Sequence, residues 1–484
     1  MRHDLASSFN TPEFQAIKHK YEEMKQNHTH VYMESNELTH LAEYYAHQGD
    51  SKASEEVINY GLQLHPENLD ILIYKCNNLV ARGKINEAFF LLETIPDQND
   101  REVRLTYANL CLERQDIESA EEVFKQLAEE EDNDTNTLLD IADIYMDANM
   151  EKMAYHWLQK AYRQAPNDIE VLESMADYHY SFKSVEQATV YYNKLLDEDP
   201  YNLYYWTELT RCYLQMGEIE QAMESVEFAL TINENDLTCI EMKGYCFQLL
   251  GDGTSACKCY KQVEQSVSNK TRIRMVLMAC YFIDKKYDET IQYCNKLLES
   301  NDLENFERAN VYHKRAVSHL AKGEYEESEK DVINGLTYDG EFSELYLVQG
   351  ELFVSEGKMI EAECSFRKAE SFAMEKAETA QQAATTYMRY EHFKEAVQLY
   401  HWIEKEYPEE VKDFYGYIAF CYYRLKDEKN MLKYMVRSCF YTPESLSNLL
   451  WGEKDMGEDQ DFFNLARIVL KEIQEGKINV SSFL

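Results

Sequence analysis

LYYWTELTRCYLQMGEIEQAMESVEFALTINEND, residues 203–236, is one complete 34-residue unit of a pattern that recurs along this 484-residue chain. Near its middle is Ala222, one of five alanines spaced 34 residues apart. The other four are Ala120, Ala154, Ala188 and Ala256. A fixed period of this length is typical of a solenoid built from one repeated supersecondary unit. Such a unit buries its apolar face only by stacking on its neighbours.

The position of Ala222, called the small slot below, recurs in the other copies of the unit as well as in the five with alanine spaced by 34. The further occupants are Ser54, Ala88, Thr290, Ser328, Ala362, Ala396 and Met431. Upstream of the slot, Trp206, Leu209, Thr210 and Tyr213 follow one another at steps of three, one and three residues. This spacing places them on one face of a helix.

A turn and a second helix complete each unit. Glycine recurs five residues before the small slot, where a tight turn benefits from it: Gly49, Gly83, Gly217, Gly251, Gly323 and Gly357. A second apolar-periodic helix follows, and several copies stop at a proline: Pro66, Pro166, Pro200, Pro408 and Pro443. Each unit is therefore predicted to be a helix, a turn and an antiparallel helix.

These residues resemble the tetratricopeptide repeat (TPR), a 34-residue helix–turn–helix unit. The resemblance implies an all-α fold, a right-handed superhelical solenoid of about twelve repeats. The copies start near 35, 69, 101, 135, 169, 203, 237, 271, 309, 343, 377 and 412. It implies little about the ligand, since members of the family share an architecture and not a function.

The repeat frame predicts four segments: a capping helix in 1–34, repeats one to eight in 35–308, repeats nine to twelve in 309–445, and a C-terminal helix and tail in 446–484. The insertion at 302–308, before the ninth copy, is the expected kink or sub-domain boundary. Thr11 and Pro12 are suited to start the first helix, with Phe14, Ile17, Tyr21 and Met24 on its apolar face. In the tail, Phe462, Leu465, Val469 and Ile473 form a similar face. Both helices are expected to cap the array; homo-oligomerisation through them is the alternative.

Composition narrows the function classes. The net charge of −39 disfavours nucleic acid, whose phosphates are held by clustered Lys and Arg, and disfavours anionic membrane surfaces. The N-terminal residues do not resemble a secretory signal, and no apolar run approaches the length of a membrane span. Twelve cysteines at scattered repeat positions suit small apolar side chains in a reducing compartment, so we expect a cytoplasmic protein.

In TPR proteins the first helix of each repeat lines the concave surface, which suggests a binding groove here. The candidate groove residues are Asp140, Asp143, Asp147, Glu173, Asp177, Tyr204, Arg211, Met242, Tyr245, Met275, Phe282, His313 and Lys314. The hypothesis is that a basic segment binds the acidic wall of copies three to five, which also includes Glu102, Glu113 and Glu170. An apolar side chain of the partner would be anchored near copies seven to nine. The alternative is that so acidic a protein carries carboxylates on every face for solubility.

Other site chemistries find little support. Inner positions of the first three copies, such as Asn36, Thr39 and Glu102, lack the cations with which some TPR proteins grip a C-terminal carboxylate. Cys257 and Cys259, two residues apart on a helix, do not face the same way, which disfavours a metal or redox pair. We find no nucleophile–base pair, and we expect no metal, cofactor or enzymatic activity.

The sequence therefore predicts a scaffold or adaptor that binds a protein or peptide. Two alternatives remain open at this point. One is a regulatory receptor whose groove closes on a peptide, and the other, less favoured, is an enzyme with an unrecognised site.

Overall fold

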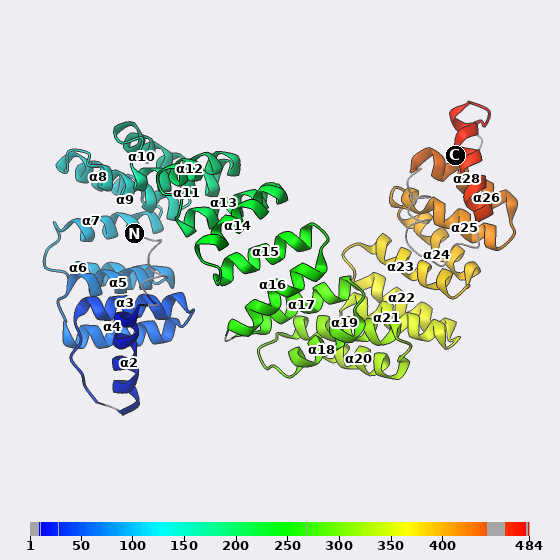
Figure 1. The fold of residues 1–484 in the computed structure, drawn as a ribbon, viewed down its shortest axis with the longest axis horizontal. Coiled ribbons are helices and arrows are strands. Elements are labelled where there is room, and N and C mark those ends of the chain that lie inside the picture. The colour runs from blue at the N-terminus through cyan, green and yellow to red at the C-terminus, as the bar shows by residue number, and fades with distance from the viewer. Residues whose placement is uncertain are drawn as a thin grey trace. The chain divides into compact units, whose positions relative to one another are not determined.

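The computed structural model describes residues 9, 11–27, 29–267, 269–442, 460–480 and 483. The described residues are helical apart from short turns and loops, and no strand occurs among them (Figure 1). The chain forms two compact units, Met1–Cys246 and Phe247–Leu484. The division falls inside a helix of the seventh repeat.

The first unit contains the N-terminal helix, six repeats and most of the next helix. In chain order these are α2 (Pro12–Asn27), α3 (Ser35–His47), α4 (Ser51–Leu64), α5 (Leu69–Ala81), α6 (Ile85–Glu93), α7 (Arg101–Glu113), α8 (Ile117–Glu130), α9 (Thr135–Asp147), α10 (Glu151–Gln164), α11 (Ile169–Tyr178), the π-helix η1 (His179–Lys183), α12 (Val185–Glu198), α13 (Leu203–Met216), α14 (Ile219–Ile232) and α15 (Leu237–Leu249), which runs into the second unit.

The second unit continues the same alternation. Its helices are α16 (Gly253–Ser266), α17 (Thr271–Ile283), α18 (Tyr287–Leu298), α19 (Asn305–Ala321), α20 (Tyr325–Tyr338), α21 (Ser343–Ser355), α22 (Met359–Phe372), α23 (Lys376–Arg389), α24 (Phe393–Glu406), the 3₁₀ helix η2 (Glu410–Phe414), α25 (Tyr415–Arg424), α26 (Glu428–Tyr441) and α28 (Gln460–Gln474). From α3 to α26 the described α-helices follow in twelve pairs, and each pair starts close to a predicted repeat start.

The small slot is buried in every copy. Ser54, Ala88, Ala120, Ala154, Ala188, Ala222, Ala256, Thr290, Ser328, Ala362 and Ala396 are each 0% exposed, and Met431 in the last copy is 7% exposed. A larger side chain there would push packed helices apart. The predicted repeat register and all-α repeat fold are confirmed.

The turn slot adopts the left-handed conformation that the glycines predict. Six glycines there have φ between +72° and +79°. Five other copies reach the same conformation without glycine, through Gln115, Asn149, Lys285, Glu391 and Lys426. The slot therefore fixes a backbone shape, and glycine is the residue that adopts it with least strain.

The fifth copy departs from this rule. Its turn slot is Lys183, which ends the π-helix η1 and does not have a positive φ. His179 in η1 is 6% exposed, and its ring stacks on Tyr191 with centroids 5.3 Å apart. The wider helical turn takes the place of the left-handed residue, a local feature that the repeat pattern did not predict.

Each of the two terminal helices buries apolar side chains against the repeats next to it. The backbone N–H of Phe14 donates to the Thr11 hydroxyl oxygen at 3.3 Å, so Thr11 caps α2, which begins at Pro12. Phe14, Tyr21 and Met24 are buried against the first repeat. At the other end, Phe462 and Val469 of α28 are buried against the last repeats.

Four of the predicted proline stops, Pro66, Pro166, Pro200 and Pro408, lie two residues beyond a helix end. The fifth, Pro443, is outside the described residues.

Candidate functional site

A groove of about 1050 Å³ lies on the first helices of copies two to five, within the first unit. It is lined by α5, α7, α9 and α11, with additional residues from the connection between α8 and α9. None of its lining residues belongs to α6 or α10. The first helices therefore form this wall, as the resemblance to TPR proteins implies.

Carboxylates dominate the lining. Nine of them line the groove: Glu102, Glu131, Asp134, Asp140, Asp143, Asp147, Glu170, Glu173 and Asp177. The acids of α9 are spaced by three and four residues, and those of α11 have the same spacing, so each set lies on one helical face. Five of the thirteen predicted site residues thus come together in one groove.

The groove lining includes a single cation, Arg101, and its neighbours neutralise it. Its guanidinium forms ion pairs with Glu102 at 2.8 Å, with Glu131 at 3.3 Å and with Asp140. Burial on its own lowers the pKa of Arg101, but the carboxylates, Asp140 first, raise this pKa overall. Arg101 therefore cross-links α7 to α9, and the potential of the groove stays strongly negative.

Tyrosine hydroxyls support the carboxylates at the α11 end. Tyr205 donates to Glu173 Oε1 at 2.6 Å, and Tyr192 donates to Asp177 Oδ1 at 3.0 Å. Burial raises the pKa of Tyr205 most, and the hydrogen bond with Glu173 and the charge of Glu173 raise it further. The Tyr205 hydroxyl therefore keeps its proton and serves as a donor. These bonds hold two groove acids in place.

Apolar side chains alternate with the acids. Ile73 and Val80 of α5, Leu105 of α7, and Leu139 and Ile144 of α9 also line the groove. The surface therefore offers both negative charge and apolar contact to one occupant.

The remaining predicted residues of the first unit lie outside this groove. Tyr204 and Arg211 are on α13, where Arg211 forms an ion pair with Glu208 at 3.2 Å. Met242 on α15 packs against a small cluster around Val226, and Tyr245 is 45% exposed.

The predicted residues of the second unit form separate features. Met275 and Phe282 are on α17, and the Lys314 ammonium lies 4.4 Å from the centre of the Phe282 ring. Burial lowers the pKa of Lys314. His313 lines a different groove of about 360 Å³ between α19, α21, α23 and α25, together with Glu344, Glu351 and Arg389. The predicted apolar anchor near copies seven to nine stays a prediction.

Sequence reasoning missed three charged residues of the acidic groove. Glu131 and Asp134 lie after the second helix of copy three, a region that the reading of first helices did not include. Arg101 stands at the first position of α7, and its basic side chain conflicts with a purely acidic wall. The sequence analysis predicted that inner positions of the first three copies lack cations that could bind a C-terminal carboxylate. Arg101 was not one of the positions considered there.

Two further observations concern site chemistry. The described residues contain no group of three or more His, Cys, Asp or Glu placed to hold a metal ion. Within the same parts of the chain, every helix is too short or too polar to cross a lipid bilayer.

Known proteins resemble parts of the chain. The family model of the ChAPs (Chs5p-Arf1p-binding proteins) matches residues 105–234. A tetratricopeptide repeat protein 21 homolog from Caenorhabditis briggsae is 23% identical over an alignment of 266 residues that covers 49% of this chain. The chain spans only about a fifth (20%) of the length of that relative.

Solved structures resemble parts of the chain with low TM-scores and low sequence identity. A TPR protein from Parabacteroides merdae has a TM-score of 0.38 and 18% identity, covering 52% of this chain and 98% of that protein. PilF from Pseudomonas aeruginosa has a TM-score of 0.35 and 18% identity, covering 47% and 97%.

The buried small slot, the left-handed turn and the twelve helix pairs define a tetratricopeptide-repeat protein, in agreement with the curated relative.

Proposed function

We propose that the chain is a non-enzymatic scaffold that holds a basic segment of a partner protein in the acidic groove of copies two to five. The observation that carries this proposal is the charge of the groove. Nine carboxylates line it against one arginine, which is already paired with three of them.

Charge alone does not give such a groove high affinity. An exposed ion pair contributes roughly 0.2–1 kcal/mol and weakens as salt rises. The acids therefore speed encounter and set orientation, while apolar contacts supply most of the binding free energy. Because Ile73, Leu105 and Ile144 lie among the carboxylates, the best partner segment alternates Lys or Arg with apolar side chains.

The family match supports a protein as the partner. Residues 105–234 include most of α7 and all helices from α8 to α14, so the matched region overlaps the groove. The description of that family names proteins that bind Chs5p and Arf1p. The cytoplasm is the compartment we propose, because ten of the twelve cysteines are buried as apolar side chains, a use that suits a reducing environment.

A labelled twelve-residue peptide alternating Lys and Leu tests the proposal, with a Glu–Leu peptide as its charge-reversed counterpart. The test variant carries Asp143→Asn, Asp147→Asn and Glu170→Gln. The matched control carries Glu118→Gln, Glu122→Gln and Glu129→Gln on α8, which remove the same charge outside the groove lining.

We expect the basic peptide to bind the parent and to weaken steeply between low and high salt. The groove variant should bind at least tenfold more weakly, and the control within about twofold of the parent. An equal loss in both variants would mean that the peptide senses only the overall charge, and the proposal would fail.

A further inference from the structure

The eleventh repeat lacks two bulky side chains that every other copy has. Sixteen and thirteen residues before the small slot, the sixth copy has Trp206 and Leu209, and the eleventh has Ala380 and Ala383. No other copy has alanine at either position. The other pairs, in chain order, are Leu38 and Leu41, Leu72 and Lys75, Arg104 and Tyr107, Leu138 and Ile141, Leu172 and Met175, Ile240 and Lys243, Arg274 and Leu277, Tyr312 and Arg315, Tyr346 and Gln349, and Tyr415 and Ile418.

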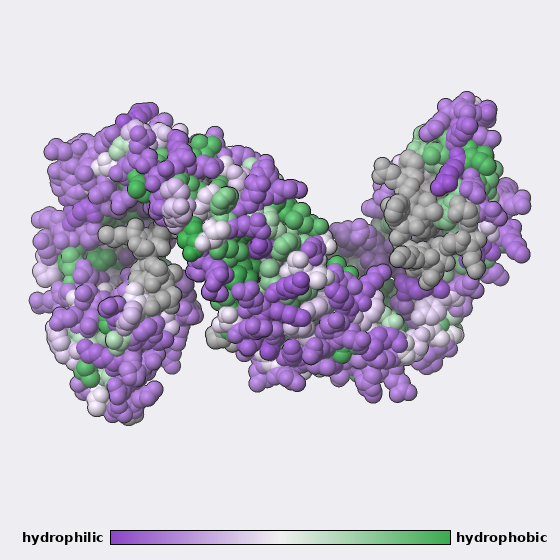
Figure 2. Space-filling model, in the orientation of Figure 1, coloured by the Kyte–Doolittle hydropathy of each residue, from purple (hydrophilic) through white to green (hydrophobic). Residues whose placement is uncertain are grey.

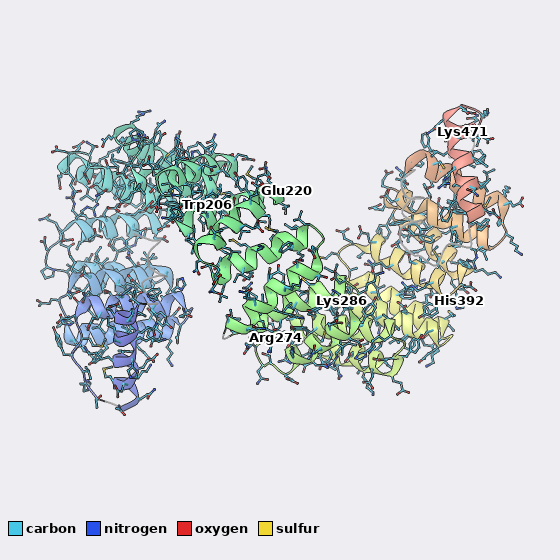
Figure 3. The ribbon with its side chains drawn as sticks, viewed as in Figure 1. Trp206, Glu220, Arg274, Lys286, His392 and Lys471 are labelled. Atoms are coloured by element: carbon cyan, nitrogen blue, oxygen red, sulfur yellow. The ribbon has the colours of Figure 1, made fainter. Side chains whose placement is uncertain are left out.

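The first of these positions has a packing role where it is aromatic. Trp206 of α13, labelled in Figure 3, stacks on Phe228 of α14 with ring centroids 4.9 Å apart. Tyr312 and Tyr346 stack in the same way on Tyr338 and Phe372, at 5.9 and 5.8 Å. In each pair, a ring on the first helix covers a ring on the second helix of its own repeat.

In the eleventh repeat this covering ring is absent. Trp402 of α24 lines a pocket together with Ala380 and Ala383 of α23. Its ring meets that of Tyr407 edge-on, with centroids 5.6 Å apart. His392, labelled in Figure 3, is the N-cap residue of the same helix α24.

A pocket of about 280 Å³ is found where the missing side chains would lie. Its apolar lining comes from three helices: Met359, Ile360 and Phe366 of α22, Ala380, Ala383 and Tyr387 of α23, and Leu399 and Trp402 of α24. Ile360 at the edge is 78% exposed, whereas Phe366 and Tyr387 are each 5% exposed. The pocket thus has a buried apolar floor and an open apolar edge.

The pocket is distinct from the groove that contains His313. That groove uses Gln381, Gln382, Thr385, Thr386 and Arg389 of α23, while the pocket uses Ala380, Ala383 and Tyr387 of the same helix. The two recesses therefore lie on different faces of α23.

The charges around the pocket are mainly negative. Glu363, Glu370 and Glu395 line it, with Arg367 as the cation among its lining residues. Arg367 is already paired with Glu363 on the same helix, at 2.7 Å. Two carboxylates beyond this pair favour positive charge in an occupant.

We infer that this pocket is a docking site for a peptide segment of a partner protein, which inserts one large apolar side chain flanked by Lys or Arg. The volume favours a side chain over a whole small-molecule ligand, whose sites typically measure roughly 300–1,000 Å³. The inserted group takes the place of the two missing repeat side chains. Its basic neighbours face Glu370 and Glu395.

The test uses labelled peptides of one length with a central Trp or Leu between lysines. Two counterparts replace the central residue by Ala or the lysines by Glu. Binding is measured by fluorescence anisotropy with the full chain carrying Asp143→Asn, Asp147→Asn and Glu170→Gln, which weaken any binding of the lysines in the acidic groove. The filling variant is Ala383→Leu, which restores a residue found at this position in other copies. The edge variant is Ile360→Ser, and its matched control is Ile333→Ser on α20, another exposed isoleucine outside the pocket.

We expect the Lys-flanked Trp and Leu peptides to bind and both counterparts to bind at least tenfold more weakly. Ala383→Leu and Ile360→Ser should each reduce binding at least tenfold, and Ile333→Ser should leave it unchanged. Because Ile360 is exposed, its variant stays informative even if Ala383→Leu lowers stability.

Three results would overturn the inference. The first is absence of binding by every peptide. The second is unchanged binding to folded Ala383→Leu and Ile360→Ser proteins. The third is concentration-dependent self-association of the parent that Ile360→Ser abolishes, since the pocket would then be a contact between copies of this chain. None of these results bears on the acidic groove, which lies in the other unit.

Discussion

Single residues show where the repeat pattern specifies backbone and where it specifies side chain. At the turn slot, Gly217 and Lys285 adopt the same left-handed conformation, with φ of +76° and +56°. A side chain beyond glycine raises the energy of this conformation because its Cβ approaches the carbonyl oxygen. The slot can therefore be identified in the sequence from its glycines, although Gln, Asn, Lys and Glu occupy it in the other copies.

The first prediction concerns this slot. Lys285→Gly is expected to stabilise the second unit by about 1 kcal/mol, because it removes left-handed strain. Gly217→Ala should destabilise the first unit by a similar amount, since no atom lies near enough to its added Cβ to compensate by packing. Urea unfolding of the two variants measures both changes. Opposite signs would contradict the account of the slot.

The second prediction concerns Glu404. Its carboxylate contacts His401, Tyr434 and Arg437, the last at 2.8 Å. The hydrogen bond with His401 is the largest effect on the pKa of Glu404, and the hydrogen bond with Tyr434 and the charge of Arg437 add to it. Together they lower this pKa to about 2, although burial alone would raise it.

Because this pKa is lowered on folding, the stabilisation is present above the unfolded pKa of about 4.3 and is lost as the pH falls towards 2. Glu404→Gln should therefore cost about 2 kcal/mol at pH 7 and about half as much at pH 3. Denaturant titrations of parent and variant at the two pH values test this. A difference that is the same at both pH values would refute the role of the charge.

At the level of helices, the small slot is the clearest link between sequence and packing. Ala154 is 0% exposed on α10, in a core that also contains Leu158 and Tyr145. The 34-residue period was enough to predict this burial. It did not predict the π-helix of the fifth copy, because the residues around His179 satisfy the repeat spacing while forming a wider turn.

The third prediction is that Ala154→Leu overpacks this contact and costs roughly 1–3 kcal/mol. The matched control is Lys152→Leu, an exposed position on the same helix. Thermal unfolding should show a lower melting temperature for the first variant and little change for the second. A melting temperature equal to that of the parent would refute the assigned packing of the slot.

The acidic groove also belongs to the scale of helices, and it was predicted in part. Asp140, Asp143 and Asp147 share the polar face of α9, a relation that helical spacing gives directly. Glu131 and Asp134 enter the groove from the connection before α9, and the period of a helix carries no information about such a segment. The neutralising role of Arg101 depends on distances between helices, which only the structure provides.

For the whole molecule, charge is the dominant property. Eighty-eight acidic residues face 49 basic ones, and Figure 2 shows hydrophilic residues over most of the visible surface. Such an excess destabilises the folded state through self-repulsion, and salt screens the repulsion.

The fourth prediction follows from this excess. Raising sodium chloride from low to moderate concentration should raise the melting temperature of the parent by several degrees. The groove variant with Asp143→Asn, Asp147→Asn and Glu170→Gln should gain less, because part of the repulsion is already removed. A melting temperature that falls with salt in both proteins would contradict the view that self-repulsion dominates.

The central claim is that the first helices of copies two to five form a binding surface for a basic partner segment. Hydrogen–deuterium exchange of the full chain, with and without the Lys–Leu peptide, tests it most directly. We predict slower exchange in α7, α9 and α11 on binding, and unchanged exchange in α8 and α10, the second helices of the same copies. Protection confined to α8 and α10, or absent from all five helices while the peptide is bound, would contradict the claim.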